Sequence, residues 1–413
     1  MDSRDQELRL PPMRQRPLSR RQLLRLTAGA VAGTSLAAVL AACGGGSEST
    51  PTTSAGGTTP TAAGGATTPS GGGATPSGGT PSAGGKLPEG APFTIGVSNG
   101  FVGSEWRTQM IQDLQAVNAD YMKAGLTKEL VIESADTDVQ GQIQQIRNLM
   151  NRGVNAIIVN PNSQTGLNAV IQEATDAGIV VIAVDQEISA PGAINVVIDQ
   201  TEWARMSARW LAEQLGGKGK IVIVNGIAGH PANEARYNGV KEVLSQYPDI
   251  EVLNVVNANW DQATGQQKMS DLLASQPQID GVWTQDGMAL GVLQAIQAAN
   301  PAKWPIVVGE ARAGYMQLWH QIKQSRPDFV SYGVINPPGI GASGLRVAVE
   351  LLSGKELKDD ALKGPFKNSL YVPIPGVVDE SNFDEEYQKI ANQPASYVLD
   401  GIASPEEIAA FFK

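Results

Sequence analysis

The chain of 413 residues contains one cysteine, Cys43, and only two histidines. An internal disulfide cannot form, and the wide separation of His230 and His320 argues against a transition-metal site. Basic residues are also few, with 31 Lys and Arg against 41 Asp and Glu and a net charge of −10. We therefore expect no metal or other cofactor and no binding to nucleic acid.

Motifs for nucleotide chemistry are missing as well. Neither a Walker loop nor Gly-x-Gly-x-x-Gly follows any apolar run, and nothing resembles a nucleophile elbow or a Ser/His/Asp set. We therefore expect that the protein is not an enzyme. A glycosidase acting through Asp185, Asp286 and Glu310 stays a less favoured alternative, because such enzymes need paired carboxylates.

A basic N-terminal head and a short apolar stretch precede Cys43. The head contains Arg20 and Arg21, and the Ala- and Leu-rich stretch at about 26–40 is shorter than the roughly 20 residues of a membrane span. This arrangement is typical of an export signal, and the twin arginine of the folded-protein route. Leu-Ala-Ala before Cys43 resembles a bacterial lipobox. We expect a lipidated Cys43 and an extracytoplasmic protein on the bacterial cell membrane, in a periplasm or on the outer face. An ordinary Sec signal or a retained anchor stays possible.

Residues 44–92 are mainly Gly, Ser, Thr, Pro and Ala in quasi-repeats, with no aromatic side chain before Phe93. Such a segment cannot bury enough apolar surface to offset its ordering entropy, so we expect a disordered linker. Residues 1–42 carry seven Arg and three acidic residues, which leaves −14 for the rest of the chain.

From residue 93 on, short Ile/Val-rich runs alternate with amphipathic segments such as Ile143, Ile146 and Leu149, and Asp138 is placed to cap the helix that contains them. This alternation is typical of parallel sheets that are covered on both faces. The runs are too many for one sheet, so we predict an α/β fold with two doubly wound parallel-sheet lobes. The expected strands are 93–98, 130–134, 156–159, 180–184, 195–198, 220–224, 250–256, 281–283, 305–308 and 330–335.

Ligands of such sheets bind beyond the carboxyl ends of the strands, where this chain carries amides, carboxylates and aromatic rings. Carboxylates accept from hydroxyl pairs, Arg and Asn donate, and an aromatic face covers the C–H side of a sugar. The pattern predicts a site for a polyhydroxylated ring. The side chains expected in it are Asn99, Phe101, Trp106, Arg107, Asp185, Gln186, Arg236, Trp260, Gln285, Asp286, Glu310 and Asn336.

Five segments in order carry a family resemblance: 152–161 (Arg-Gly-Val-Asn-Ala-Ile-Ile-Val-Asn-Pro), 181–185, 236–239, 285–291 and 307–310. The region from 93 to about 357 resembles the type I periplasmic sugar-binding proteins, the ribose/galactose branch of ABC-transporter substrate receptors. The resemblance implies two lobes joined by a three-strand hinge near 198–199, 336–338 and 371–375. The implied parts are a signal peptide (1–43), the linker (44–92), a first lobe (93–198 plus 337–372) and a second lobe (199–336 plus 373–413).

The resemblance also implies that Asp185 and Arg236 hold sugar hydroxyls and that Phe101 and Trp106 stack on the ring. It also implies that Gln285 and Asp286 lie at the tip of a second-lobe strand. Glu310 and Asn336 would complete the circle of polar contacts around the ligand. The chain departs from the family pattern at four positions, so the ribose or galactose specificity does not carry over. These are Gln186 for Arg (with Arg107 as a replacement cation), Gln285 for Asn, Glu310 for Asp and Asn336 for Gln.

Most of these side chains also have a structural alternative. Trp106 could cap the core, Asp185 could cap a turn, and Arg236 could form a surface ion pair with Glu234 or Glu242. Trp260 could open a helix without touching ligand, and Glu310 could be solvated.

The sequence hypothesis is a monomeric solute-binding lipoprotein that captures a sugar or polyol between two lobes and delivers it to the transmembrane subunits of an ABC permease. Its only link to the membrane would be the lipid. The alternative is a protein that presents ligand to a chemoreceptor, or that binds a signalling furanose.

Overall fold

The structure, a computed structural model, describes residues 89–103 and 105–413. The predicted signal peptide, Cys43 and residues 44–88 of the predicted linker lie outside these residues. Within them the chain forms two six-stranded sheets, each with helices on both faces. The predicted fold class, two doubly wound parallel-sheet lobes, is confirmed.

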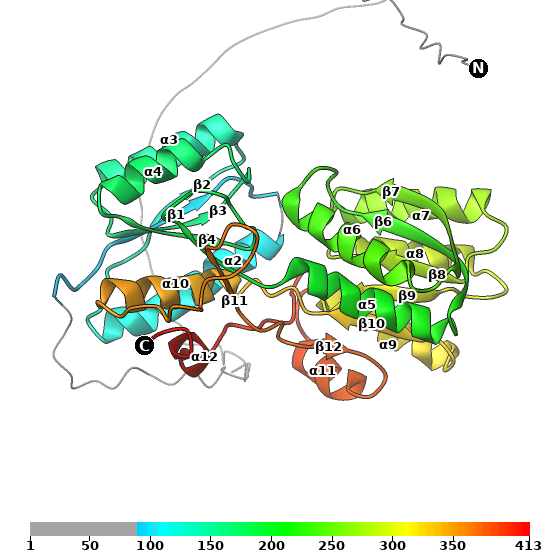
Figure 1. Cartoon of the computed structure of the whole chain (residues 1–413). Helices are drawn as coiled ribbons and strands as arrows, with labels where there is room; N and C mark the ends of the chain where they lie inside the picture. The colour runs from blue at the N-terminus through cyan, green and yellow to red at the C-terminus, as the bar shows by residue number, and fades with distance from the viewer. Residues whose placement is uncertain (1–88, 104) are drawn as a thin grey trace, which may run out of the picture. The chain divides into compact units, whose positions relative to one another are not determined.

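The first lobe contains a sheet in the order β11-β5-β4-β3-β1-β2, with every strand pair parallel. Along β3 the side chains alternate, since Ile157 and Val159 pack with α3 and α4 while Ile158 joins the core under α2 and α10. Figure 1 shows these two helix pairs on opposite faces. The elements are β1 (Ile95–Asn99), α2 (Glu105–Lys123), β2 (Val131–Ser134), α3 (Val139–Asn151), β3 (Ala156–Asn160), α4 (Asn168–Asp176), β4 (Val180–Val184), β5 (Ile194–Val197), α10 (Ile340–Leu352) and β11 (Ser369–Tyr371).

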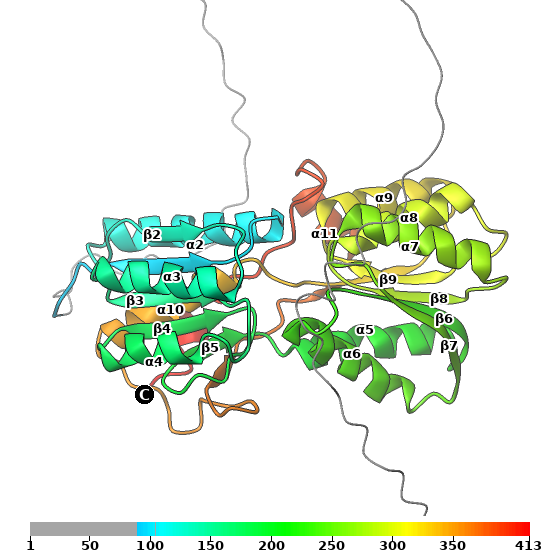
Figure 2. The same ribbon diagram turned by 90° about the horizontal axis from the view of Figure 1, so that it is seen from above.

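The second lobe repeats this plan with the order β12-β10-β9-β8-β6-β7, in which only β12 is antiparallel. Figure 2 shows α5 and α6 on one face and α7, α8 and α9 on the other. The elements are α5 (Gln200–Gln214), β6 (Lys218–Asn225), α6 (Pro231–Leu244), β7 (Asp249–Asn257), α7 (Gln262–Ser275), β8 (Gly281–Thr284), α8 (Met288–Ala299), β9 (Ile306–Glu310), α9 (Ala313–Ser325), β10 (Ser331–Val334), β12 (Val377–Val378) and α11 (Phe383–Ile390).

Local signals explain several helix starts. The predicted cap Asp138 accepts a hydrogen bond from Gly141 N at 2.9 Å, and α3 begins at the next residue. Asp199 and Asp261 cap α5 and α7 in the same way. Asp199 lies two residues after the end of the first lobe's β5, so a residue at this crossing also fixes the start of the second lobe's first helix.

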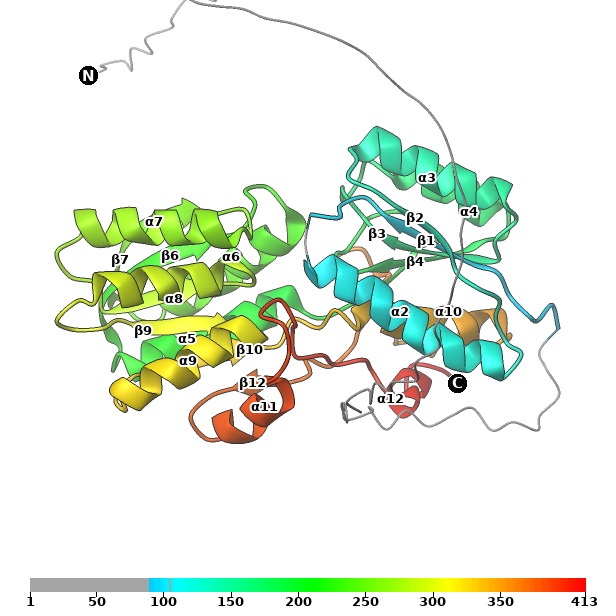
Figure 3. The ribbon, with the colours of Figure 1, turned by 180° about the vertical axis from the view of Figure 1, so that it is seen from behind.

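The chain passes between the two sheets at the three expected places, from β5 to α5, from β10 to α10 and from β11 to β12. It then passes once more, after α11, because α11 packs on α9 whereas the last helix, α12 (Pro405–Ala409), packs on α10 (Figure 3). We expected residues 373–413 to belong to the second lobe. The end of this segment, which contains α12, packs on the first lobe instead, so this part of the prediction is wrong. Ile408 and Phe412 are buried in the first-lobe core, and Leu357 forms a β-bridge with Phe412.

We call residues 395–404, which make this fourth passage, the strap. In its first half, Ala313 N donates to Tyr397 O at 2.7 Å and Leu399 N donates to Ala311 O at 2.9 Å, which ties the strap to the second lobe. The side chain of Gln109 on α2 bonds both N and O of Val398, each at 3.0 Å. The same few residues of the strap are thus hydrogen-bonded to elements of both sheets.

Candidate functional site

Arg236 is the centre of the polar cluster at the carboxyl ends of the second sheet's strands. Its side chain is 1% exposed and comes from α6. Nε donates to Gln200 Oε1 at 2.8 Å, and Nη1 donates to Gln285 Oε1 at 2.9 Å and to Asp286. The guanidinium lies 4.2 Å from the ring centroid of Trp203, a cation–π contact that fixes it from behind.

This geometry decides one alternative for Arg236. Glu242 pairs with Arg205, and Glu234 accepts from the backbone N of Gly229, so neither surface carboxylate pairs with Arg236. The charged partner of Arg236 is Asp286 instead, whose side chain is 14% exposed. An unpaired arginine in this position would be costly, so the pair keeps the cation in place before any ligand arrives.

Asp286 and Asn336 connect this cluster to the hinge. Asn336 Nδ2 donates to Asp286 Oδ1 at 3.2 Å. The carbonyl oxygen of Asn336 accepts from Trp106 Nε1 at 2.8 Å, and the ring of Trp106 is 6% exposed in the first-lobe core. Trp106 thus has the packing role that was its structural alternative, and it holds a hinge residue.

The first lobe contributes Asn99, Arg107 and Asp185. Arg107 Nη1 donates to Asn99 Oδ1 at 2.9 Å. Burial raises the pKa of Asp185, while the positive charges of Arg107 and Arg236 act in the opposite direction. The carboxylate of Asp185 therefore lies in the field of one cation from each lobe. Asp185 also has φ of 71°, a left-handed conformation that is rare for non-glycine residues and concentrated at functional sites.

Gln186 follows Asp185 and turns inward. Its Nε2 donates to Asn160 Oδ1 at 3.3 Å, and it is buried. Burial also lowers the pKa of Arg107, whose charge is supported by Asp185. Arg107 thus supplies a positive charge that acts on Asp185.

Glu310 is fully buried at the end of β9. Arg312 Nε donates to Glu310 Oε2 at 2.8 Å, while Oε1 has no hydrogen-bond partner among the described residues. Burial raises the Glu310 pKa to about 6, with Arg312 opposing the shift and Asp286 adding to it. The alternative of a solvated Glu310 is excluded.

Two aromatic side chains lie at the margin of the cluster. Trp260 has φ of 55° and donates Nε1 to Gln285 Oε1 at 3.1 Å. Phe101 is 40% exposed in the loop after β1, with the Arg107 guanidinium 5.8 Å from its centroid. Phe101 is therefore partly open to solvent, whereas the Nε1 edge of Trp260 faces Gln285.

The set of twelve expected site residues omits four polar side chains of this region: His230, Gln200, Asn160 and Arg312. His230 meets Trp260 edge-on with 4.6 Å between ring centroids, and burial beside Arg107 and Arg236 lowers its pKa to about 3. His230 is therefore neutral at physiological pH and can donate one hydrogen bond and accept another. Its position directly before a helix-starting Pro231 was the available signal, since it places the ring beyond the end of β6.

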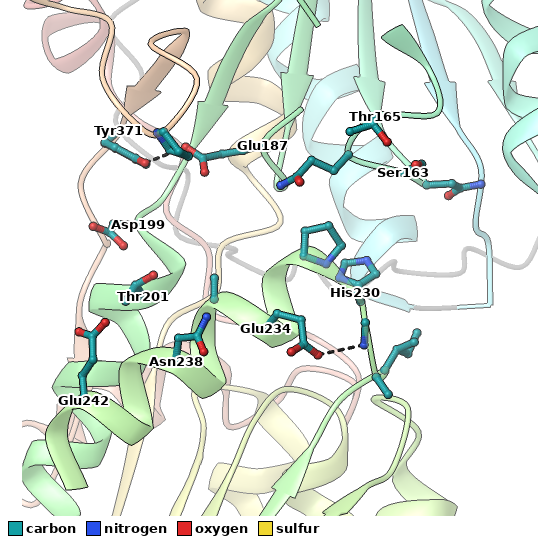
Figure 4. Close-up of a pocket in the computed structure, with 18 of the residues that line it drawn as sticks. Ser163, Thr165, Glu187, Asp199, Thr201, His230, Glu234, Asn238, Glu242 and Tyr371 are labelled. Carbon is teal, nitrogen blue, oxygen red and sulfur yellow. Dashed lines mark hydrogen bonds between the residues drawn. The ribbon is translucent and has the colours of Figure 1, made fainter. Parts of the chain in front are cut away.

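A cavity of about 900 Å³ opens beside this cluster and is lined from both lobes. Figure 4 shows His230, Thr165, Glu187 and Asp199 around it. None of the twelve predicted site residues lines this space, and His230, which lines it, contacts Trp260 of the polar cluster. The cavity has charged side chains of its own, including the Arg205–Glu242 pair, whereas Arg107, Asp185 and Arg236 lie in the cluster.

No helix among the described residues is long and apolar enough to cross a membrane. No group of three or more His, Cys, Asp or Glu side chains within 89–103 and 105–413 could hold a metal ion.

Comparisons with known proteins agree with the geometry. The periplasmic binding protein domain model matches residues 95–356. The xylitol-binding protein of Mycolicibacterium smegmatis is 36% identical over 258 residues, 61% of this chain and 72% of that protein. The ribose import binding protein of Bacillus subtilis is 25% identical over 279 residues, 67% of this chain and 86% of that protein.

Among solved structures, an ABC transporter solute binding protein from Thermobispora bispora is similar with a TM-score of 0.66 and 27% identity, covering 77% of this chain and 94% of that chain. Its likeness covers both lobes, whereas the family model ends at residue 356. The two parallel-sheet lobes and the match over 95–356 show that this chain belongs to the periplasmic binding protein family, with the type I fold.

Proposed function

We propose that the protein captures a sugar or polyol between its two lobes and delivers it to an ABC permease. The observation that carries the proposal is the charge arrangement around Asp185, which lies in the field of Arg107 from its own lobe and of Arg236 from the other. A carboxylate flanked by two guanidinium groups can accept from a hydroxyl pair while the arginines donate to neighbouring oxygens. The xylitol-binding and ribose-binding relatives support the same ligand class.

Binding would favour the closed arrangement of the lobes, because only there can one ligand bond to both groups of side chains. The proposed contacts are Asn99, Phe101, Arg107, Asp185 and Gln186 from the first lobe and Arg236, Trp260, Gln285, Asp286, Glu310 and Asn336 from the second lobe and hinge. His230 is added to this set, whereas Trp106 acts through Asn336.

The attachment to the membrane and the partner are also part of the proposal. The family is one of extracytoplasmic solute-binding proteins, and the lipobox-like sequence before Cys43 supports a lipid anchor. A neutral sugar or polyol carried by a monomer to permease subunits is consistent with the similarity to import binding proteins and ABC transporter solute binding proteins.

A thermal-shift screen of the purified chain tests the ligand class. A ligand that binds only the folded state raises the melting temperature, so we expect a rise with xylitol, ribose or another pentose, hexose, polyol or inositol. A rise with none of them, for a protein that melts cooperatively and carries no co-purified solute, would refute the proposal.

A further inference from the structure

Arg312 lies where the proposed ligand site, the first lobe and the strap meet. Its Nε donates to Glu310 Oε2 at 2.8 Å, and Nη1 donates to Ser396 O at 3.4 Å. Nη1 also lies 3.8 Å from an oxygen of Glu105 on the first lobe's α2. Arg312 is 7% exposed, whereas the Glu105 side chain is 73% exposed.

The strap holds the backbone around this arginine. Arg312 forms an antiparallel bridge with Val398, and the residues on either side of it bond to Tyr397 and Leu399. The guanidinium is therefore placed by a segment more than eighty residues further along the chain. The short sequence Glu310-Ala311-Arg312 keeps the two charges close along the chain. It does not by itself orient the Arg312 side chain toward Glu310.

Glu310 has two carboxylate oxygens with different surroundings. Arg312 occupies Oε2, and Oε1 is buried without a partner among the described residues. A buried acceptor without a donor costs free energy until a donor reaches it. A hydroxyl group of a ligand in the proposed site would supply that donor.

We infer that Arg312 is a positioning residue: it holds Glu310 as an oriented carboxylate whose Oε1 receives a ligand hydroxyl. This inference rests on the proposed function, since it concerns the same site. The charged groups acting on Glu310 are Arg312, Asp286 and Arg236, and those acting on Arg312 are Glu310, Asp286 and Glu105.

The pH dependence distinguishes positioning through charge from a purely structural role. Burial already raises the Glu310 pKa to about 6, and the positive charge of Arg312 limits that rise. Without Arg312 the pKa of Glu310 rises further. At pH 8 Arg312→Gln then leaves a buried carboxylate unpaired, whereas at pH 5 Glu310 is mostly protonated and the loss is smaller.

The first experiment needs no ligand and compares urea unfolding of the full chain at pH 5 and pH 8. We expect the destabilisation by Arg312→Gln to be larger at pH 8. In the double variant Glu310→Gln/Arg312→Gln the pH dependence of this loss should disappear. Glu105→Gln is the matched control, because it removes an exposed partner of the same arginine and should change neither value. An equal loss at both pH values would overturn the inference.

The second experiment uses xylitol and D-ribose as probes in calorimetric titrations at pH 8. We expect at least tenfold weaker binding in Arg312→Gln, partial recovery in Arg312→Lys, and wild-type affinity in Glu105→Gln. Unchanged affinity in Arg312→Gln would overturn the inference while leaving the proposed function intact. If neither probe binds the wild type, the proposed ligand class fails for these two solutes, and the unfolding experiment still decides the role of Arg312.

Discussion

At the scale of single residues, Arg236 is the group whose loss should affect binding most. Arg236→Ala removes the donors to Gln285 and Asp286 and leaves the Asp286 carboxylate, which is 14% exposed, without its charged partner. We expect at least a hundredfold loss of affinity, about 2.7 kcal/mol, for whichever sugar or polyol binds. Arg147→Ala, which removes an exposed pair with Glu173, is the control and should bind normally. Normal binding by Arg236→Ala would remove this residue from the site.

Asp185 tests the first-lobe half of the same site. Asp185→Asn keeps the shape of the side chain but replaces one acceptor oxygen with a donor, beside Arg107. We expect affinity to fall at least tenfold, about 1.4 kcal/mol, with the melting temperature of the unliganded protein unchanged or raised, because a buried charge is removed. A ligand titration of the wild type and the variant measures the affinity, and circular dichroism checks that both proteins are equally folded. Full affinity in the variant would assign Asp185 to turn capping alone.

A second pair of carboxyls, away from the ligand site, should control stability against pH. Burial and the neighbouring Asp400 raise the Asp113 pKa to about 7, well above its unfolded value of about 3.9. The unfolded chain releases this proton at lower pH than the folded protein, so the free energy of unfolding falls as pH rises from about 4 to about 7. Asp113→Asn should reduce this slope, because only the contribution of Asp400 then remains, and should be more stable than wild type at pH 8.

Denaturant unfolding across this pH range measures the effect. Asp120→Asn changes an exposed carboxylate of the same helix, which pairs with Lys123, and should keep the wild-type slope. We base the expected effect of Asp113→Asn on the Oδ2 atom of Asp113, which is buried and has no hydrogen-bond partner among the described residues. An unaltered slope in Asp113→Asn would show that this carboxyl titrates normally.

At the scale of elements, the α5–α6 contact is close enough to depend on one glycine. A Cβ added at Gly239 would lie 2.4 Å from the carbonyl oxygen of Thr201. Overpacking costs roughly 1–3 kcal/mol, and the gain of about 1 kcal/mol from helix propensity offsets only part of it. We therefore expect Gly239→Ala to unfold at lower urea concentration. Asn238→Ala, at the exposed neighbouring position, should stay within about 0.5 kcal/mol of wild type.

Element signals in the sequence were strong where strands were long and apolar. All ten expected strands overlap observed ones, and the cap at Asp138 is confirmed. The sequence did not predict β11 and β12, because they have only three and two residues and pair with distant strands. Their formation depends on tertiary contacts, which no local pattern contains.

The site was predictable to a similar degree and for a similar reason. Residues directly after strands, such as Asp185 and Asp286, could be placed because parallel strands end at one edge. Arg312 could not, since its direction depends on the strap more than eighty residues away. The hydrogen bond from Trp106 to Asn336 likewise could not be predicted, because it joins positions that are 230 residues apart in the sequence.

At the scale of the whole molecule, the strap adds a fourth link between the sheets. Gln109→Leu keeps the size of the side chain but leaves N and O of Val398 without the two bonds that they now make. We expect faster hydrogen exchange of the strap amides and a loss of stability of about 1–3 kcal/mol. Gln112→Leu, an exposed position on the same helix, should leave strap exchange unchanged. Unchanged protection in Gln109→Leu would show that the strap is held by its other contacts.

The central claim is that the two lobes together bind a sugar or polyol through the cluster around Arg236 and Asp185. The most direct test is a calorimetric titration of the best solute from the thermal screen, starting with xylitol, into the wild type and Arg236→Ala. The account predicts micromolar or tighter binding by the wild type, about 8 kcal/mol or more, and at least a hundredfold weaker binding by the variant. Equal binding by both, or no binding of any sugar or polyol by folded wild-type protein, would contradict it.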